Sequence, residues 1–149
     1  MLIGETPLFQ TTVERIDGLA EGVKRITPRS HDGTPLPSWS PGAHSDVGLP
    51  GGLIRQYSLC GHVSDGEHWQ FAVLREPQSR GGSSWIHERL NNGDTLQVRG
   101  PRNEFPLADA LEYVFVAGGI GITPLLPMIR EVSTRMVPWH LTYGGRRIK

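Results

Sequence analysis

The pattern of apolar residues changes at about residue 110, and this change most constrains the fold. Before it, segments such as 11–17 and 22–30 carry β-branched residues at alternating positions and are separated by turns rich in glycine and proline. After it, the apolar run 112–119 is typical of a parallel strand buried on both faces. A glycine turn, a helix from Thr123-Pro124 and a second strand over 139–145 are expected to follow. The chain is therefore predicted to be mainly β at first and then α/β.

The first part is expected to contain about six short strands and one helix. The strands are predicted over 11–17, 22–30, 43–47, 53–61, 68–76 and 94–100. The helix, 83–90, follows Gly81-Gly82, begins with serines able to cap it, and stops at Asn91-Asn92-Gly93 in a left-handed turn. Many short strands with one helix fit a small closed antiparallel barrel better than an open sheet.

The second part is predicted to be one βαβ unit, the nucleus of a doubly wound nucleotide-binding sheet. Residues 110–149 amount to about one such unit, whereas a typical domain needs roughly 100 residues. We therefore expect residues 1–109 to form the barrel and residues 110–149 to form the first part of an incomplete, truncated nucleotide-binding domain. Such a half-sheet would leave an unpaired strand edge and exposed apolar helix faces, so low solubility or association is expected.

Composition excludes several classes of protein. Lys plus Arg equals Asp plus Glu at 15 each, so no basic field favours nucleic acid or an anionic membrane. The single Cys60 cannot form an internal disulfide, a four-thiolate zinc site or an iron–sulfur cluster. The six histidines form no metal-binding pattern, and neither a serine-hydrolase elbow nor a P-loop is present. No export signal or membrane span is recognised, so a cytoplasmic location is expected. No catalytic or metal-binding residue is assigned.

Three clusters have the residue types that bind a planar, anionic ligand. The first is Arg55-Gln56-Tyr57-Ser58, at the end of a predicted strand. Arginine pairs with phosphate, tyrosine stacks on a ring, and serine hydrogen-bonds a ring heteroatom. The alternative is an ordinary strand whose polar residues face outward.

The second cluster, Arg80-Gly81-Gly82-Ser83-Ser84, opens the predicted helix. Free backbone N–H groups at a helix start, with glycines that allow close approach and added hydroxyl groups, form a cradle for phosphate. Arg75 and Arg80 would add positive charge. The alternative is a flexible turn followed by a serine cap.

The third cluster, 118–124, lies directly after the apolar strand and contains Gly118, Gly119, Gly121, Thr123 and Pro124. Its glycines would let the backbone approach a pyrophosphate that faces the helix start. Pro124 stands where the third glycine of the dinucleotide fingerprint would be, so the fingerprint is imperfect. A purely structural turn is the alternative.

In this order the clusters resemble the ferredoxin reductase-like flavoprotein family, most closely its phthalate dioxygenase reductase and vanillate demethylase reductase branch. The matching blocks are 55–60, 72–76, 80–83, 100–107 and 117–124. The resemblance implies a barrel that holds a flavin, FMN in this branch and FAD in related ones. It also implies an α/β domain that brings NADH or NADPH against the flavin.

The resemblance also implies a role for each matching residue. Arg55 and Ser58 would touch the flavin phosphate and ring, and Tyr57 would stack on the isoalloxazine. The backbone at 73–75 would meet the ring edge, and 82–84 would cradle the terminal phosphate. Thr123 would lie near the flavin, and 118–121 would face the nicotinamide nucleotide. The implied cofactor-binding residues are Arg55, Gln56, Tyr57, Ser58, Val73, Leu74, Arg75, Gly81, Gly82, Ser83, Ser84, Gly118, Gly119, Gly121, Thr123 and Pro124.

The implied function is that of an NAD(P)H-dependent flavin oxidoreductase. It would be the reductase component that passes electrons to a partner oxygenase, a Rieske-type aromatic dioxygenase or demethylase, or to a ferredoxin-type acceptor. Hydride transfer to flavin needs positioning rather than acid–base residues. With Cys60 alone, the [2Fe–2S] domain of full-length relatives is absent. The alternatives are a non-catalytic flavin-binding fragment and an inert barrel remnant. NADH is favoured by the branch, although Arg146 and Arg147 could either accept a 2′-phosphate or be solvated surface.

Overall fold

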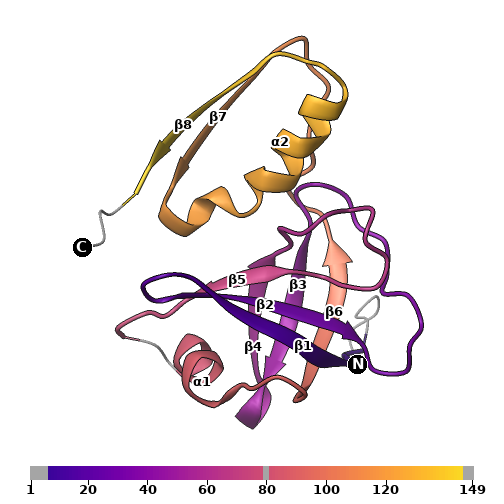
Figure 1. Ribbon diagram of the computed structural model, residues 1–149, viewed down its shortest axis with the longest axis vertical. Helices are drawn as coiled ribbons and strands as arrows, with labels where there is room; N and C mark the ends of the chain where they lie inside the picture. The colour runs from indigo at the N-terminus through magenta and orange to yellow at the C-terminus, as the bar shows by residue number, and fades with distance from the viewer. Residues whose placement is uncertain (1–6, 79–80, 146–149) are drawn as a thin grey trace.

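The computed structural model describes residues 7–78 and 81–145 (Figure 1). Strands β1 to β6 and helix α1 form one part, and strands β7 and β8 with helix α2 form a second part above it in this view. The first part contains one six-stranded sheet, and the second contains one two-stranded sheet. The change of pattern at about residue 110 therefore marks the change from one sheet to the other.

The first sheet is a nearly closed antiparallel barrel, as predicted. Its strands are β1 (Phe9–Ala20), β2 (Val23–Ser30), β3 (His44–Leu49), β4 (Leu53–Ser58), β5 (Phe71–Leu74) and β6 (Thr95–Arg102), in the order β4-β3-β6-β1-β2-β5. A short 3-10 turn, Pro50–Gly52, joins β3 to β4. Beyond the two end strands, the N–H of Cys60 donates to the carbonyl of Gln70 at 2.9 Å, which draws the open sides of the sheet together.

The barrel forms because alternate residues of its strands turn inward. Val47, Val98, Ile26 and Phe71 come from four different strands and are fully buried in one core. Apolar burial of this kind stabilises a fold by roughly 25 cal/mol per Å² of surface removed from water. Helix α1 (Gly82–Arg89) adds Ile86 to the same core. The predicted hairpin over 11–30 is confirmed by the antiparallel pairing of β1 with β2.

Helix α1 begins in a different way from that predicted. Its N-cap is Gly81, with a left-handed φ of +99°, and no side chain caps the helix. Ser83 does not cap it, because the Ser83 hydroxyl accepts a hydrogen bond from the N–H of Glu76 at 3.1 Å. The helix ends where Leu90 becomes extended, and the left-handed Gly93 follows in the next turn. The prediction of serine caps was therefore wrong.

The second part is the predicted βαβ unit. Strand β7 (Tyr113–Gly118) leads through a 3-10 turn, η2 (Gly119–Ile122), into α2 (Leu125–Thr134) and back along β8 (Trp139–Gly144). The two strands are parallel. Tyr113 and Phe115 stack on one another and pack with α2 in a second core, separate from that of the barrel. The helix buries its apolar side, so the expectation of exposed apolar helix faces was wrong for this helix.

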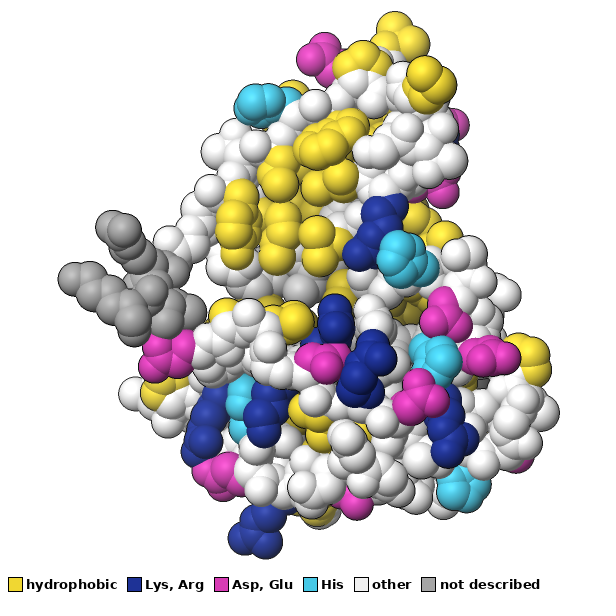
Figure 2. Space-filling model, viewed as in Figure 1, with side chains coloured by type: hydrophobic (Ala, Val, Ile, Leu, Met, Phe, Trp, Pro, Cys, Tyr) yellow, Lys and Arg dark blue, Asp and Glu magenta, His cyan; other side chains and the backbone are white. Residues whose placement is uncertain are grey.

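Strand β7 is buried on one face only, contrary to prediction. Val114 and Val116, on the face away from α2, are 66% and 73% exposed. The reason is that α2 covers one face of β7, and no described element packs on the other. Figure 2 shows charged side chains spread over the barrel and hydrophobic ones gathered on the visible face of the βαβ unit. Within the described ranges, no helix is both long and apolar enough to cross a membrane.

Candidate functional site

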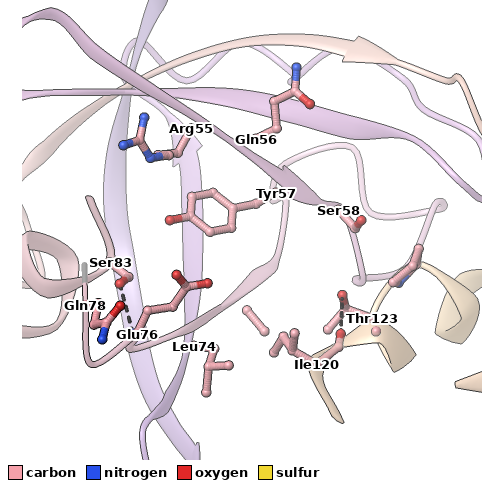
Figure 3. Close-up of a pocket in the computed structure, with 13 residues that line it drawn as sticks. Arg55, Gln56, Tyr57, Ser58, Leu74, Glu76, Gln78, Ser83, Ile120 and Thr123 are labelled. Carbon is pink, nitrogen blue, oxygen red and sulfur yellow. Dashed lines mark hydrogen bonds between the residues drawn. The ribbon is translucent and has the colours of Figure 1, made fainter. Parts of the chain in front are cut away.

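A pocket of about 550 Å³ lies at the junction between the barrel and the βαβ unit (Figure 3). Its volume falls within the usual range for small-molecule sites. Four segments contribute to it: the end of β4, strand β5 with the loop after it, the start of α1, and, far along the chain, the glycine turn after β7. The lining residues are Arg55, Gln56, Tyr57, Ser58, Ala72, Leu74, Glu76, Gln78, Ser83, Ile120, Gly121, Thr123 and Pro124.

Tyr57 forms an anchored part of the β4 wall. Its ring stacks on the fully buried Phe71, with centroids 5.2 Å apart and an interplanar angle of 16°. Figure 3 shows its side chain among those of Arg55, Glu76 and Ser58. Burial raises the pKa of Tyr57, the Arg55 charge opposes this rise, and the Glu76 carboxylate adds to it. The phenol is therefore a neutral hydrogen-bonding group at physiological pH.

Arg55 lies beside the start of α1. A Cβ added to Gly82 would be 3.1 Å from Arg55 Cγ and 3.3 Å from its Nε, so the absence of a side chain lets the arginine stem lie on the first helical turn. Arg55 Nη1 donates to the carbonyl of Ile54 at 3.0 Å, and no carboxylate of the described residues pairs with the guanidinium. The first backbone N–H groups of a helix have no partner within it and attract anions. This side of the pocket therefore suits a phosphate.

Other residues of the predicted phosphate cradle have different roles. Arg75 pairs with Glu88 of α1 and does not line the pocket. The Val73 side chain is fully buried, and its carbonyl accepts a hydrogen bond from His87 Nε2 at 2.8 Å. Gly81, Gly82 and Ser84 also lie outside the pocket lining, although Gly82 supports Arg55. Arg80, Arg146 and Arg147 lie outside the described residues.

The glycine turn supplies the wall that comes from the βαβ unit. Ile120, Gly121, Thr123 and Pro124 reach the pocket. Thr123 Oγ1 donates to the carbonyl of Ile120 at 3.0 Å, a bond drawn in Figure 3, so the hydroxyl fixes the turn and keeps its acceptor lone pairs.

The first two glycines of the turn do not line the pocket. Gly118 ends β7, and the carbonyl of Gly119 accepts a hydrogen bond from the Tyr143 hydroxyl at 3.0 Å. Gly118 and Gly119 therefore lie at the carboxyl edge of the parallel strands, where doubly wound sheets bind nucleotides.

Three lining residues were not among those predicted to bind the cofactor or to face the nucleotide: Ala72, Glu76 and Gln78. A strand turns alternate residues to the same side, so a period of two along 72–76 groups Ala72, Leu74 and Glu76 and excludes Val73 and Arg75. The period of two is visible in the sequence, but which of the two sets faces the pocket is not. Ile120 lies within the segment 118–121 that was predicted to face the nucleotide, whereas nothing in the local sequence distinguishes Gln78.

Among the described residues that line it, the pocket combines apolar walls with one guanidinium and one carboxylate. Among the described residues, no group of three His, Cys, Asp or Glu side chains is placed to hold a metal ion. A planar ligand with an anionic end fits this arrangement, and the fold and pocket together define a two-part protein with a ligand site between an antiparallel barrel and a βαβ unit.

Comparison with known proteins agrees with this class. No protein-family model matches the chain. The chain is 48% identical over 116 residues to the vanillate O-demethylase oxidoreductase of Pseudomonas sp. (strain HR199 / DSM 7063), and this match covers 77% of the chain and 37% of the relative. It is 40% identical over 130 residues to the phthalate 4,5-dioxygenase oxygenase reductase subunit of Pseudomonas putida, which covers 86% and 40%.

A solved structure gives the same result. The chain superimposes with a TM-score of 0.88 and 34% identity on phthalate dioxygenase reductase, and the match covers 94% of this chain and 44% of that one. That protein is described as a modular structure for electron transfer from pyridine nucleotides to [2Fe–2S]. The chain is therefore homologous to the phthalate dioxygenase reductase and vanillate demethylase reductase branch of the ferredoxin reductase-like family, which confirms the resemblance predicted from its motifs. It spans less than half the length of these relatives.

Proposed function

We propose that this chain is the flavin-binding and nicotinamide-facing part of an NAD(P)H-dependent oxidoreductase. In this proposal it belongs to a reductase component that passes electrons through flavin to a partner oxygenase, a Rieske-type aromatic dioxygenase or demethylase, or to a ferredoxin-type acceptor. The observation that supports it most directly is the junction pocket, where the β4 segment, β5, the start of α1 and the glycine turn meet. The names of the homologous reductases support the choice of partner.

The donor set and the apolar lining of the pocket support a flavin as its ligand. Arg55, held against Gly82, would bind the phosphate together with the start of α1. Tyr57, Leu74 and Pro124 provide apolar surface for the ring. When bound, a flavin accepts hydride from nicotinamide and releases electrons one at a time.

The residues of the chain would orient the reactants rather than exchange protons with them. The stack on Phe71 fixes Tyr57, so its neutral hydroxyl is held at one position in the pocket. Arg55 and Glu76 carry opposite charges in the same pocket, which favours one direction of an elongated anionic ligand over its reverse. The turn of Ile120 and Pro124 closes the pocket on the side of the βαβ unit and would exclude water there.

The finer assignments belong to the same proposal. We propose FMN as the flavin because the described lining places the Arg55 guanidinium beside the start of α1, which suits a terminal phosphate, and because the matching motifs resemble the branch that uses FMN. We also propose domains over 1–109 and 110–149, supported by the two separate sheets and cores. A cytoplasmic location, in agreement with the free Cys60, and NADH as electron donor are proposed as well.

The test is an absorbance spectrum of the purified chain after incubation with FMN and desalting, followed by anaerobic addition of NADH. Retained flavin bands that bleach on NADH would support the whole proposal. Retained bands that do not bleach would reduce it to flavin binding, and loss of all flavin would overturn it. Arg55→Met should lose flavin, whereas the matched Arg75→Met, which removes an arginine paired outside the pocket, should retain it.

A further inference from the structure

Helix α2 carries an arginine that reaches from the βαβ unit to the barrel. Arg130 Nη1 donates to the carbonyl of Cys60 at 2.9 Å and to that of Gly61 at 2.7 Å. Among hydrogen bonds between described residues, these two are the ones that join the βαβ unit to residues 7–102. Over the part of the chain that the structure describes, the polar connection between the two parts therefore depends on one guanidinium.

The acceptor carbonyls are held firmly by the barrel. The N–H of Cys60 donates to the carbonyl of Gln70 at 2.9 Å, and that of Leu59 donates to Ala43 at 3.0 Å. Gly61 packs so closely on Gln70 that an added Cβ would be 3.3 Å from its side chain. Because these residues are fixed to the barrel, the two carbonyls present a defined position for the guanidinium.

Both ends of this connection lead to the pocket. Cys60 lies two residues after the end of β4, whose residues 55–58 form one wall. Helix α2 follows directly after Thr123 and Pro124, which form the facing wall. A change in the Arg130 contact would therefore change the separation of the two walls.

We propose that Arg130 is a positioning residue that sets the distance between the two walls of the junction pocket. The consequence for catalysis depends on the function proposed above, since hydride transfer requires close alignment of two rings. A displacement of about 1 Å can slow such a reaction by up to about a hundredfold. Flavin binding, which involves mainly barrel residues, should change little.

The first test measures geometry and needs no flavin. Two exposed positions, Gln97 in β6 and Ser133 in α2, are replaced by cysteine in a Cys60→Ser background and carry spin labels. The distance between the two labels reports the distance between the barrel and the helix. Arg130→Met should broaden or shift the distance distribution. The matched variant Arg135→Met should not, because Arg135 pairs with Glu131 of its own helix and with Asp109 in the connection after β6, not with a strand of the barrel.

The second test measures function in the chain without labels. Arg130→Met should reduce the rate of flavin reduction at saturating NADH by about tenfold or more, while the Kd for FMN stays within about twofold. Arg130→Lys, whose ammonium can donate to both carbonyls, should restore the distance distribution and most of the rate.

An unchanged distance distribution in Arg130→Met would overturn the proposal, and an effect that lysine does not reverse would overturn the explanation by hydrogen bonds. If Arg130→Met fails to fold, Arg130→Gln gives the same test, because its side chain stays polar but is two atoms shorter than arginine and falls short of the two carbonyls. If the native chain binds no flavin or is not reduced by NADH, the proposed function fails, and the distance measurement alone decides the role of Arg130.

Discussion

Replacement of Gly82 by alanine should weaken flavin binding without weakening the fold. The new Cβ would be 3.1 Å from Arg55 Cγ and 3.3 Å from its Nε, tighter than most real contacts, so the arginine must move by a few tenths of an ångström. Its contact with Leu49 at 3.5 Å is ordinary. Because a long flexible side chain yields at little cost, the strain should appear as a displaced guanidinium rather than as lost stability.

The magnitude follows from the bond that is disturbed. A hydrogen bond to a charged group contributes about 1.5–3 kcal/mol, so its complete loss in Arg55→Met should raise the Kd for FMN by about tenfold to a hundredfold. Partial displacement in Gly82→Ala should raise it by about fivefold to tenfold. Alanine is a better helix former than glycine, so the free energy of unfolding should stay equal or rise by up to ~1 kcal/mol.

Titration of FMN, followed by quenching of its fluorescence, measures the affinity, and urea unfolding measures stability. Gly18→Ala is the matched control, because a Cβ there meets nothing within 4 Å and the residue lies in β1, away from the pocket. An unchanged Kd in Gly82→Ala, together with a weakened Kd in Arg55→Met, would refute the idea that the helix start positions the guanidinium.

Three further predictions concern the barrel. Asp46→Asn should lower the free energy of unfolding by about 3 kcal/mol in urea titrations, because the buried carboxylate pairs with the largely buried Arg99 at 2.9 Å. Hydrogen bonds, first from the Thr34 hydroxyl, hold the pKa of Asp32 well below its ordinary value of 3.8. Its stabilising effect should therefore be complete above about pH 4 and disappear as pH falls further, so melting temperatures between pH 5 and 2 should fall less steeply in Asp32→Asn. Burial raises the pKa of the Cys60 thiol, so the native chain should react with a disulfide reagent at pH 8 at least about tenfold more slowly than the urea-unfolded chain.

Local chemistry in the sequence was sufficient to predict the elements and the segments of the site. Alternating β-branched residues predicted the hairpin of β1 and β2, and the glycine turn before Thr123-Pro124 predicted the start of α2. The β4 segment and the glycine turn both reach the pocket, although more than sixty residues separate Ser58 from Gly121. Such motifs are visible in a sequence because short-range geometry determines them.

The face to which each strand side chain points could not be predicted without the folded structure. Whether Val73 or its neighbours face the pocket depends on the phase of an alternation, and this phase is fixed by packing against the rest of the barrel. Likewise, the apolar character of Val114 and Val116 predicts burial, but burial depends on a neighbour to cover them. The prediction of serine caps was wrong for a similar reason, because the Ser83 hydroxyl accepts a hydrogen bond from the N–H of Glu76, in the loop between β5 and α1.

The strand order also determines when the barrel can form during synthesis. Strand β6 lies between β3 and β1, so neither can complete its pairing until residues 95–102 have been made. At ribosomal rates of roughly 5–20 residues per second, β1 waits about 4–16 seconds and β3 about 3–11 seconds for β6 to be complete. The hairpin of β1 and β2 can form within microseconds of its emergence, yet the edge of β1 that pairs with β6 stays free until β6 has been made. The nascent chain is therefore most exposed to aggregation before β6 emerges, and the βαβ unit forms on a barrel that is already closed.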